Sequence, residues 1–170
     1  FFGGTLKLSA AWTDHLSTAF PEVRLKSFLE MRGADGGPWS RICALPAFWV
    51  GLLYDQGALD AAWDLVKDWD MAGREALRGA VPKLGLDAPL PKSVRGGGGT
   101  LRDIAGEVLA ISRSGLTARG KLNASGDNET CYLAPLDEIV ASGKVPAQRL
   151  LDKFHGEWDG DMARVYEESF

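Results

Sequence analysis

The chain contains 170 residues, carries a formal net charge of −4 and is 45% hydrophobic. A chain of this length and composition is typical of a soluble globular protein that buries a sizeable core. Its mild acidity argues against a nucleic-acid-binding protein, which normally presents a basic surface. The most apolar stretch, residues 42–54, is too short to span a bilayer. We therefore expect neither nucleic acid nor a membrane as a partner.

Only two cysteines are present, Cys43 and Cys131, and neither lies at a spacing typical of metal or redox sites. Two thiols do not make a disulfide scaffold of the kind found in small secreted proteins. We expect both thiols to be reduced and the protein to be cytoplasmic. A bridge between them, or to a partner outside the chain, is the alternative.

The first part of the chain contains the only strand signals. Residues 6–8 indicate a short strand, and residues 12–20 indicate one or two helical turns before Pro21. Residues 23–32 alternate between apolar and polar side chains, which predicts a strand, and a phase shift at Ser27 and Phe28 indicates a bulge. Because a single strand forms no stable sheet, we expect residues outside this chain to complete one.

Beyond Trp39, apolar residues recur at helical spacing. Ser40 can cap a helix that continues to residue 53 with a bend at Pro46. A later helix is expected to stop before Pro82, and Thr100 can cap the helix that follows it. After the first helix, the pattern predicts helices over residues 55–69, 71–81, 101–116, 136–140, 146–155 and 162–170.

The predicted fold class is α+β and mainly α, with one or two strands followed by a helical region. A strand-bearing segment covers residues 1–38, and a helical region covers residues 39–170. Glycines 96–99 form the only low-complexity run, which predicts a flexible loop, because it lacks the Lys-Ser/Thr pair of a phosphate-binding loop.

Glu30 and Arg32 are the residues whose spacing best suits binding chemistry. They are two apart on the predicted strand, so their side chains project from one face. A carboxylate supplies a hard oxygen ligand for Mg²⁺, and a guanidinium group pairs with phosphate oxygens. Arg24, Lys26 and Glu22 fall on the same side if no bulge intervenes. The alternative is a solvated strand face with cross-strand ion pairs.

Four stretches of sequence closely resemble the glutamate–cysteine ligase family of plants and many bacteria. They are residues 12–16, 20–26, 28–39 (Phe-Leu-Glu-Met-Arg-Gly-Ala-Asp-Gly-Gly-Pro-Trp) and 41–55. The resemblance implies ATP-dependent formation of γ-glutamylcysteine through a γ-glutamyl phosphate, the first step of glutathione biosynthesis. It also implies a fold like that of glutamine synthetase, with an antiparallel sheet around the site.

The resemblance also implies roles for individual residues. Glu30 and Arg32 match a pair that serves Mg²⁺ and ATP phosphates, and Arg24 is a further candidate for phosphate or a substrate carboxylate. Trp12 and His15 match the family pattern as substrate-site or structural residues.

Cys43 matches a position that in plant relatives joins a regulatory disulfide with a cysteine earlier in the chain. Such a partner would lie outside these 170 residues. Redox control through Cys43 is therefore an expectation that needs another part of the protein.

Family members run to several hundred residues, and their earlier acidic strands hold most of the Mg²⁺ and the glutamate. We therefore expect this chain to act with the remainder of a ligase chain, on glutamate, cysteine and ATP, and to be inactive alone. Two alternatives remain open. One is a related carboxylate–amine ligase with another amine acceptor, and the other is a non-catalytic helical interaction domain.

Overall fold

The computed structural model describes residues 12, 15, 18, 21–34 and 36–169. The chain comprises two compact units, Phe1–Gly36 and Gly37–Phe170. The strand expected at residues 6–8 lies outside the described residues. Of residues 12–20, the structure describes Trp12 and His15, which are helical, and Thr18, which lies in a turn.

The first unit contains a β-hairpin. Strand β1 (Val23–Leu25) pairs antiparallel with β2 (Leu29–Met31), with Arg24 opposite Glu30. The backbone N–H of Lys26 donates to the Phe28 carbonyl at 2.8 Å across the turn. The prediction of one bulged strand over residues 23–32 is therefore wrong, because the phase shift at Ser27 and Phe28 marks a reversal of the chain.

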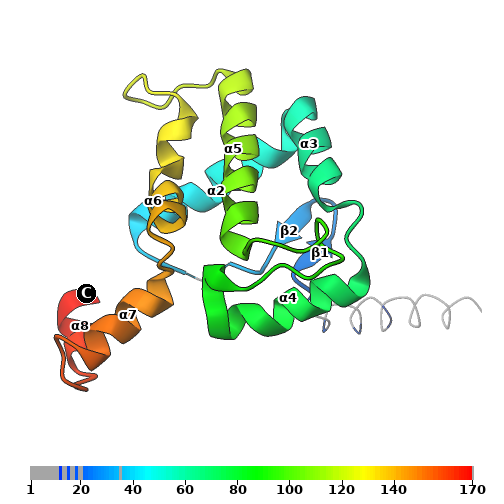
Figure 1. Cartoon of the computed structure of the whole chain (residues 1–170). Coiled ribbons are helices and arrows are strands. Elements are labelled where there is room, and N and C mark those ends of the chain that lie inside the picture. The colour runs from blue at the N-terminus through cyan, green and yellow to red at the C-terminus, as the bar shows by residue number, and fades with distance from the viewer. Residues whose placement is uncertain (1–11, 13–14, 16–17, 19–20, 35, 170) are drawn as a thin grey trace, which may run out of the picture. The chain divides into compact units, whose positions relative to one another are not determined.

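The second unit is built of helices, so the α+β, mainly α class is confirmed (Figure 1). Its α-helices are α2 (Trp39–Leu53), α3 (Gln56–Val66), α4 (Met71–Leu84), α5 (Leu101–Arg119), α6 (Ala134–Ser142), α7 (Pro146–His155) and α8 (Arg164–Ser169). Two short 3₁₀ helices complete the unit: η1 (Gly85–Asp87) follows α4, and η2 (Glu129–Leu133) leads into α6. The helix predicted over residues 146–155 is confirmed with the same bounds.

Two predicted helix ends are wrong. Helix α2 begins at Trp39 with Pro38 as its N-cap, so Ser40 lies inside the helix. Helix α4 runs through Pro82 and ends two residues later at Leu84: the Gly85 N–H still bonds to the Val81 carbonyl, so the missing proline donor does not end the helix. The predicted cap of α5 is confirmed: the Asp103 carboxylate accepts a 2.7 Å hydrogen bond from the Thr100 N–H.

Helix α5 is the centre of the helical unit. It packs against α2, α3 and α6, which surround it in Figure 1. The buried side chains form two apolar clusters, and α5 contributes to both of them. The first comprises Ala47, Leu109, Leu116 and Leu133, and the second comprises Leu77, Leu90, Val94 and Ile104.

Helices α2 and α5 cross at a point where neither has room for a side chain. A Cβ atom added to Gly115 would lie 1.9 Å from the Gly51 carbonyl oxygen, and one added to Gly51 would lie 2.3 Å from the Ser112 carbonyl oxygen. The buried Ser112 hydroxyl donates to the Phe48 carbonyl at 2.9 Å. At the crossing the two backbones are therefore in direct contact, and the Ser112 hydrogen bond stabilises this contact.

The loop before α5 contains the glycine run. All four glycines have positive φ, at 78°, 75°, 98° and 90° for Gly96 to Gly99, and Arg95 precedes them at 54°. These residues take a left-handed path that glycine permits, and the flexibility expected from the sequence stays a prediction.

No single helix among the described residues is long and apolar enough to cross a membrane. Helices α2 and α3 meet the length and composition criteria only as a pair, with a 90° bend between them.

Substitution of Gly115 by alanine tests the helix crossing. We expect Gly115→Ala to lower the free energy of unfolding by about 3 kcal/mol, because the added methyl group forces two backbones apart. Urea unfolding followed by circular dichroism measures the change. Gly79→Ala in α4 is the matched control: nothing lies within 4 Å of its added Cβ, so it should stabilise α4 by about 0.5–1 kcal/mol. Equal destabilisation by both variants would contradict the close crossing.

Candidate functional site

The hairpin brings three of the predicted site residues together. The Arg24 Nε lies 2.7 Å from Glu30 Oε2, and the Arg32 Nη1 lies 3.5 Å from the same oxygen. The three side chains are between 19% and 32% exposed, so each is mostly covered. The carboxylate is held between two guanidinium groups at a partly buried surface.

The strand geometry explains this arrangement. Arg24 and Glu30 are directly opposite one another in an antiparallel pair, so their side chains share a face. Arg32 follows two residues after Glu30 and projects to the same side. The Arg32 N–H donates to the Glu22 carbonyl at 2.8 Å, which continues the ladder beyond the strand ends.

The charge state of Glu30 follows from its neighbours. The hydrogen bond from Arg24 holds the pKa of the Glu30 carboxyl below its usual value, and the charges of Arg24, Lys26 and Arg32 act in the same direction. Partial burial opposes this shift without reversing it. Glu30 is therefore an ionised carboxylate at neutral pH.

The chemistry of this face suits an anion together with a divalent cation. Arg24, Lys26 and Arg32 place three positive charges around Glu30. Among the described residues there is no group of three or more acidic, histidine or cysteine side chains suited to hold a metal. Mg²⁺ often takes only one or two carboxylates and completes its coordination with waters and substrate phosphates. Glu30 fits that partial role, and the arginines fit the phosphates.

Trp12 and His15 lie in the same unit as the hairpin. Their rings are 5.8 Å apart between centroids and tilted by 33°, and both side chains are exposed. A substrate-site role for either one stays a prediction.

The two cysteines lie in the helical unit. Cys43 is half-buried in α2, Cys131 is exposed in η2, and both thiols are free. Redox control through Cys43 also stays a prediction, because the cysteine proposed to pair with it is not part of this chain.

The sequence did not single out a second charged cluster, which lines a cavity in the helical unit. Its cations are Arg41, Arg149 and Lys153. Arg149 and Lys153 are four residues apart on α7, and that spacing is the signal that could have paired them on one helix face. Arg41 could not have been found in this way, because it comes from α2 and meets α7 only through the tertiary fold.

Comparison with known proteins decides the family. The pattern described as glutamate–cysteine ligase family 2 (GCS2) matches residues 4–168. The chain belongs to this family.

Similar sequences include the chloroplastic glutamate–cysteine ligase of Arabidopsis thaliana, 49% identical over 157 residues. The chloroplastic glutamate–cysteine ligases of Solanum lycopersicum and Oryza sativa subsp. indica (ligase A) are each 46% identical, over 157 and 165 residues. The matches cover 92% to 97% of this chain but only 28% to 31% of the relatives. The chain therefore spans less than a third of the length of these ligases.

The same relatives overturn the expected location. We expected a cytoplasmic protein because its two cysteines form no disulfide pattern. The three glutamate–cysteine ligases compared above are all chloroplastic, so the cytoplasmic prediction is wrong. Reduced thiols are compatible with more than one compartment, and they could not have distinguished between them.

The pKa of Glu30 tests the hairpin cluster. We expect Arg24→Gln to raise that pKa toward its usual value, because the shortest contact to the carboxylate is lost. Arg32→Gln should raise it less, since its guanidinium lies further away. Carbon-13 NMR titration of the glutamate side chains measures both changes.

The stability associated with Glu30 has a defined pH dependence. A lowered pKa in the folded state means that this stabilisation is present above the pKa of the unfolded chain and is lost as pH falls through the folded-state value. Identical Glu30 titration in the wild type and Arg24→Gln would contradict the pairing.

Proposed function

We propose that this chain forms part of an ATP-dependent glutamate–cysteine ligase and that its hairpin supplies one wall of the Mg²⁺–ATP site. The observation that carries the proposal is the Arg24–Glu30–Arg32 cluster in a chain whose family pattern covers residues 4–168. The name of each compared relative describes this ligase activity.

The reaction requires negative charges to approach one another. The γ-carboxylate of glutamate attacks the terminal phosphorus of ATP, which releases ADP and leaves a γ-glutamyl phosphate. The amine of cysteine then attacks the acyl carbon, loses a proton and displaces inorganic phosphate. Cations aimed at the phosphate oxygens lower the barrier by offsetting the repulsion between carboxylate and triphosphate.

The arginines and the glutamate of the hairpin suit different parts of the Mg²⁺–ATP complex. Arg32 presents a fork of donors that matches phosphate oxygens, and Arg24 can serve a phosphate or a substrate carboxylate. Glu30 offers a hard oxygen to Mg²⁺, which supplies charge neutralisation at the phosphates when bound. Before ligands arrive, the ion pairs hold these three side chains in place, so little side-chain entropy remains to be lost on binding.

The apolar face of the hairpin indicates that the hairpin belongs to a larger sheet. Val23, Leu25 and Leu29 are all exposed, although they lie on the face opposite the charged cluster. A two-stranded hairpin is marginally stable without further strands or a covering element. We infer that the remainder of a ligase chain covers this face within a glutamine-synthetase-like sheet, and that glutamate, cysteine and ATP bind where the two parts meet.

A hybrid ligase tests the proposed roles. The matching region of the Arabidopsis thaliana relative is replaced by this chain, and γ-glutamylcysteine formation is measured. We expect an active hybrid in which Glu30→Gln raises the Mg²⁺ concentration needed for half-maximal rate and Arg32→Gln raises the KM for ATP. Each should also lower kcat by about 100-fold, because charge stabilisation in the transition state is lost.

Glu75→Gln and Arg78→Gln are the matched controls for the hybrid. They remove an exposed ion pair on α4 and should leave both constants unchanged. A folded but inactive hybrid would contradict the proposed role of this chain in the ligase site. If another amine replaced cysteine with higher kcat/KM, the related carboxylate–amine ligase would be the better assignment.

The isolated 170-residue chain should not release phosphate from ATP in the presence of glutamate and cysteine, even at saturating Mg²⁺. At the hairpin the described residues supply two carboxylates, Glu22 and Glu30, and form no group of three or more metal-binding side chains, which is too few to hold metal, nucleotide and glutamate together. A coupled phosphate assay measures the rate. Clear turnover by the isolated chain would show that it contains a complete site.

A further inference from the structure

A cavity of about 370 Å³ lies within the helical unit. Its walls come from the first turn of α2, from α6 and α7, and from the segment that follows α7. The volume falls in the range of small-molecule sites, roughly 300–1,000 Å³.

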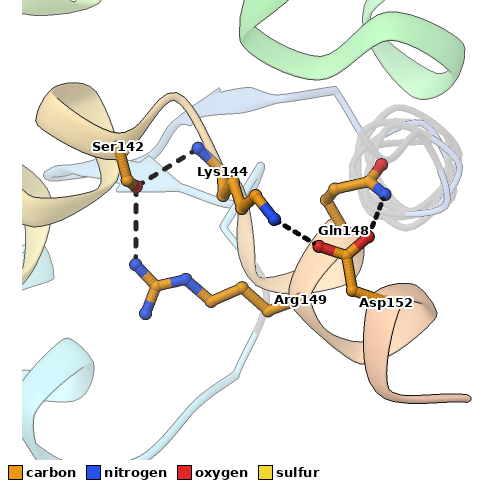
Figure 2. Close-up of polar contacts among 5 residues, drawn as sticks. All are labelled: Ser142, Lys144, Gln148, Arg149 and Asp152. Atoms are coloured by element: carbon orange, nitrogen blue, oxygen red, sulfur yellow. Dashed lines mark hydrogen bonds and ion pairs between the residues drawn. The ribbon is translucent and has the colours of Figure 1, made fainter. Parts of the chain in front are cut away.

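The junction between α6 and α7 is held by a polar network, drawn in Figure 2. Lys144 Nζ lies 2.6 Å from Asp152 Oδ2, and Gln148 donates to the other oxygen of that carboxylate at 2.8 Å. Arg149 reaches back to the Ser142 hydroxyl at 3.5 Å. These bonds tie the start of α7 to the end of α6, so the two cavity walls are fixed relative to each other.

Four of the five charged side chains of the cavity neutralise one another in pairs. Arg149 donates to Glu138 at 2.8 Å. Lys153 pairs with Glu168, whose other oxygen accepts a 2.6 Å hydrogen bond from the Trp158 indole. Both pairs lie on the part of the lining that α6, α7 and the C-terminal segment contribute.

Arg41 is the remaining charge. Among the residues that the structure describes, none forms an ion pair or hydrogen bond with its guanidinium group, and Arg41 is a half-buried residue of the cavity lining. A positive charge in the first turn of a helix is also opposed by the helix dipole, and α2 has no acidic residue in that turn to offset it. Helix stability therefore does not explain this arginine, and the lining of the cavity has a net charge of +1.

We propose that this cavity binds a small anion through Arg41. The anionic group is a carboxylate or phosphate, which matches the fork of guanidinium donors. The apolar surface of Ile139, Leu150 and Trp158 on the same lining contacts the rest of the ligand. All of these residues belong to the unit Gly37–Phe170, so the proposal does not depend on the hairpin or on ligase activity.

NMR titration of the whole 170-residue chain tests the site. Inorganic phosphate and succinate are added separately at constant ionic strength, and the indole N–H of Trp158 is followed, assigned with Trp158→Phe. We expect a saturable shift with at least one of the two anions, and the tighter one identifies the ligand as phosphate or carboxylate. Arg41→Gln should weaken this binding by about tenfold or more.

Two further variants keep the result interpretable. Arg78→Gln, on the exposed face of α4, is the matched control and should bind like the wild type. Arg41→Lys keeps the positive charge but loses the paired donors of the guanidinium group, so its affinity for the anion should lie between those of the wild type and Arg41→Gln. The proposal is overturned if neither anion shifts the Trp158 signal up to about 50 mM, or if Arg41→Gln binds as tightly as the wild type.

Discussion

The close crossing of α2 and α5 is the constraint on which the helical unit depends. Two glycines let the backbones touch, and the Ser112 hydroxyl bonds across to α2 at 2.9 Å. Because α5 also contributes to both apolar clusters, its position relative to α2 determines how the other helices pack. A larger residue at Gly51 or Gly115 would therefore disturb much more than one contact.

The same crossing makes the anion cavity a product of tertiary structure. Arg41 is carried by α2, whereas its neighbours in the cavity lie on α6, α7 and the final segment. Helix α6 packs on both α2 and α5. Charges that are distant in sequence therefore share one cavity only because these helices pack together, and α2 is positioned by its glycine contact with α5.

Much of the fold could be predicted from local sequence. The helix over residues 146–155 and the Thr100 cap follow from spacing and capping chemistry, which act over a few residues. The hairpin was missed because alternation looks the same in one strand as in two strands joined by a short turn. The end of α4 was misplaced because the helix tolerates Pro82 in its last turn, where the Gly85 N–H still bonds to the Val81 carbonyl.

The hairpin site was accessible to sequence reasoning only in part. The spacing of Glu30 and Arg32 placed them on one face, whereas the 2.7 Å contact with Arg24 required the register of the hairpin. The family roles of Glu30 and Arg32 came from resemblance and not from geometry. The cavity around Arg41 was out of reach, because no local pattern states which helices will meet.

The glycine run before α5 shows why a repeated residue can suit a particular backbone conformation. Five successive residues, Arg95 to Gly99, adopt positive φ, the hand that L-amino acids disfavour. Glycine is the one achiral residue, so it adopts this hand at no steric penalty. Repetition of glycine at these positions thus matches a run of left-handed backbone, which an achiral residue accommodates more easily than any other residue does.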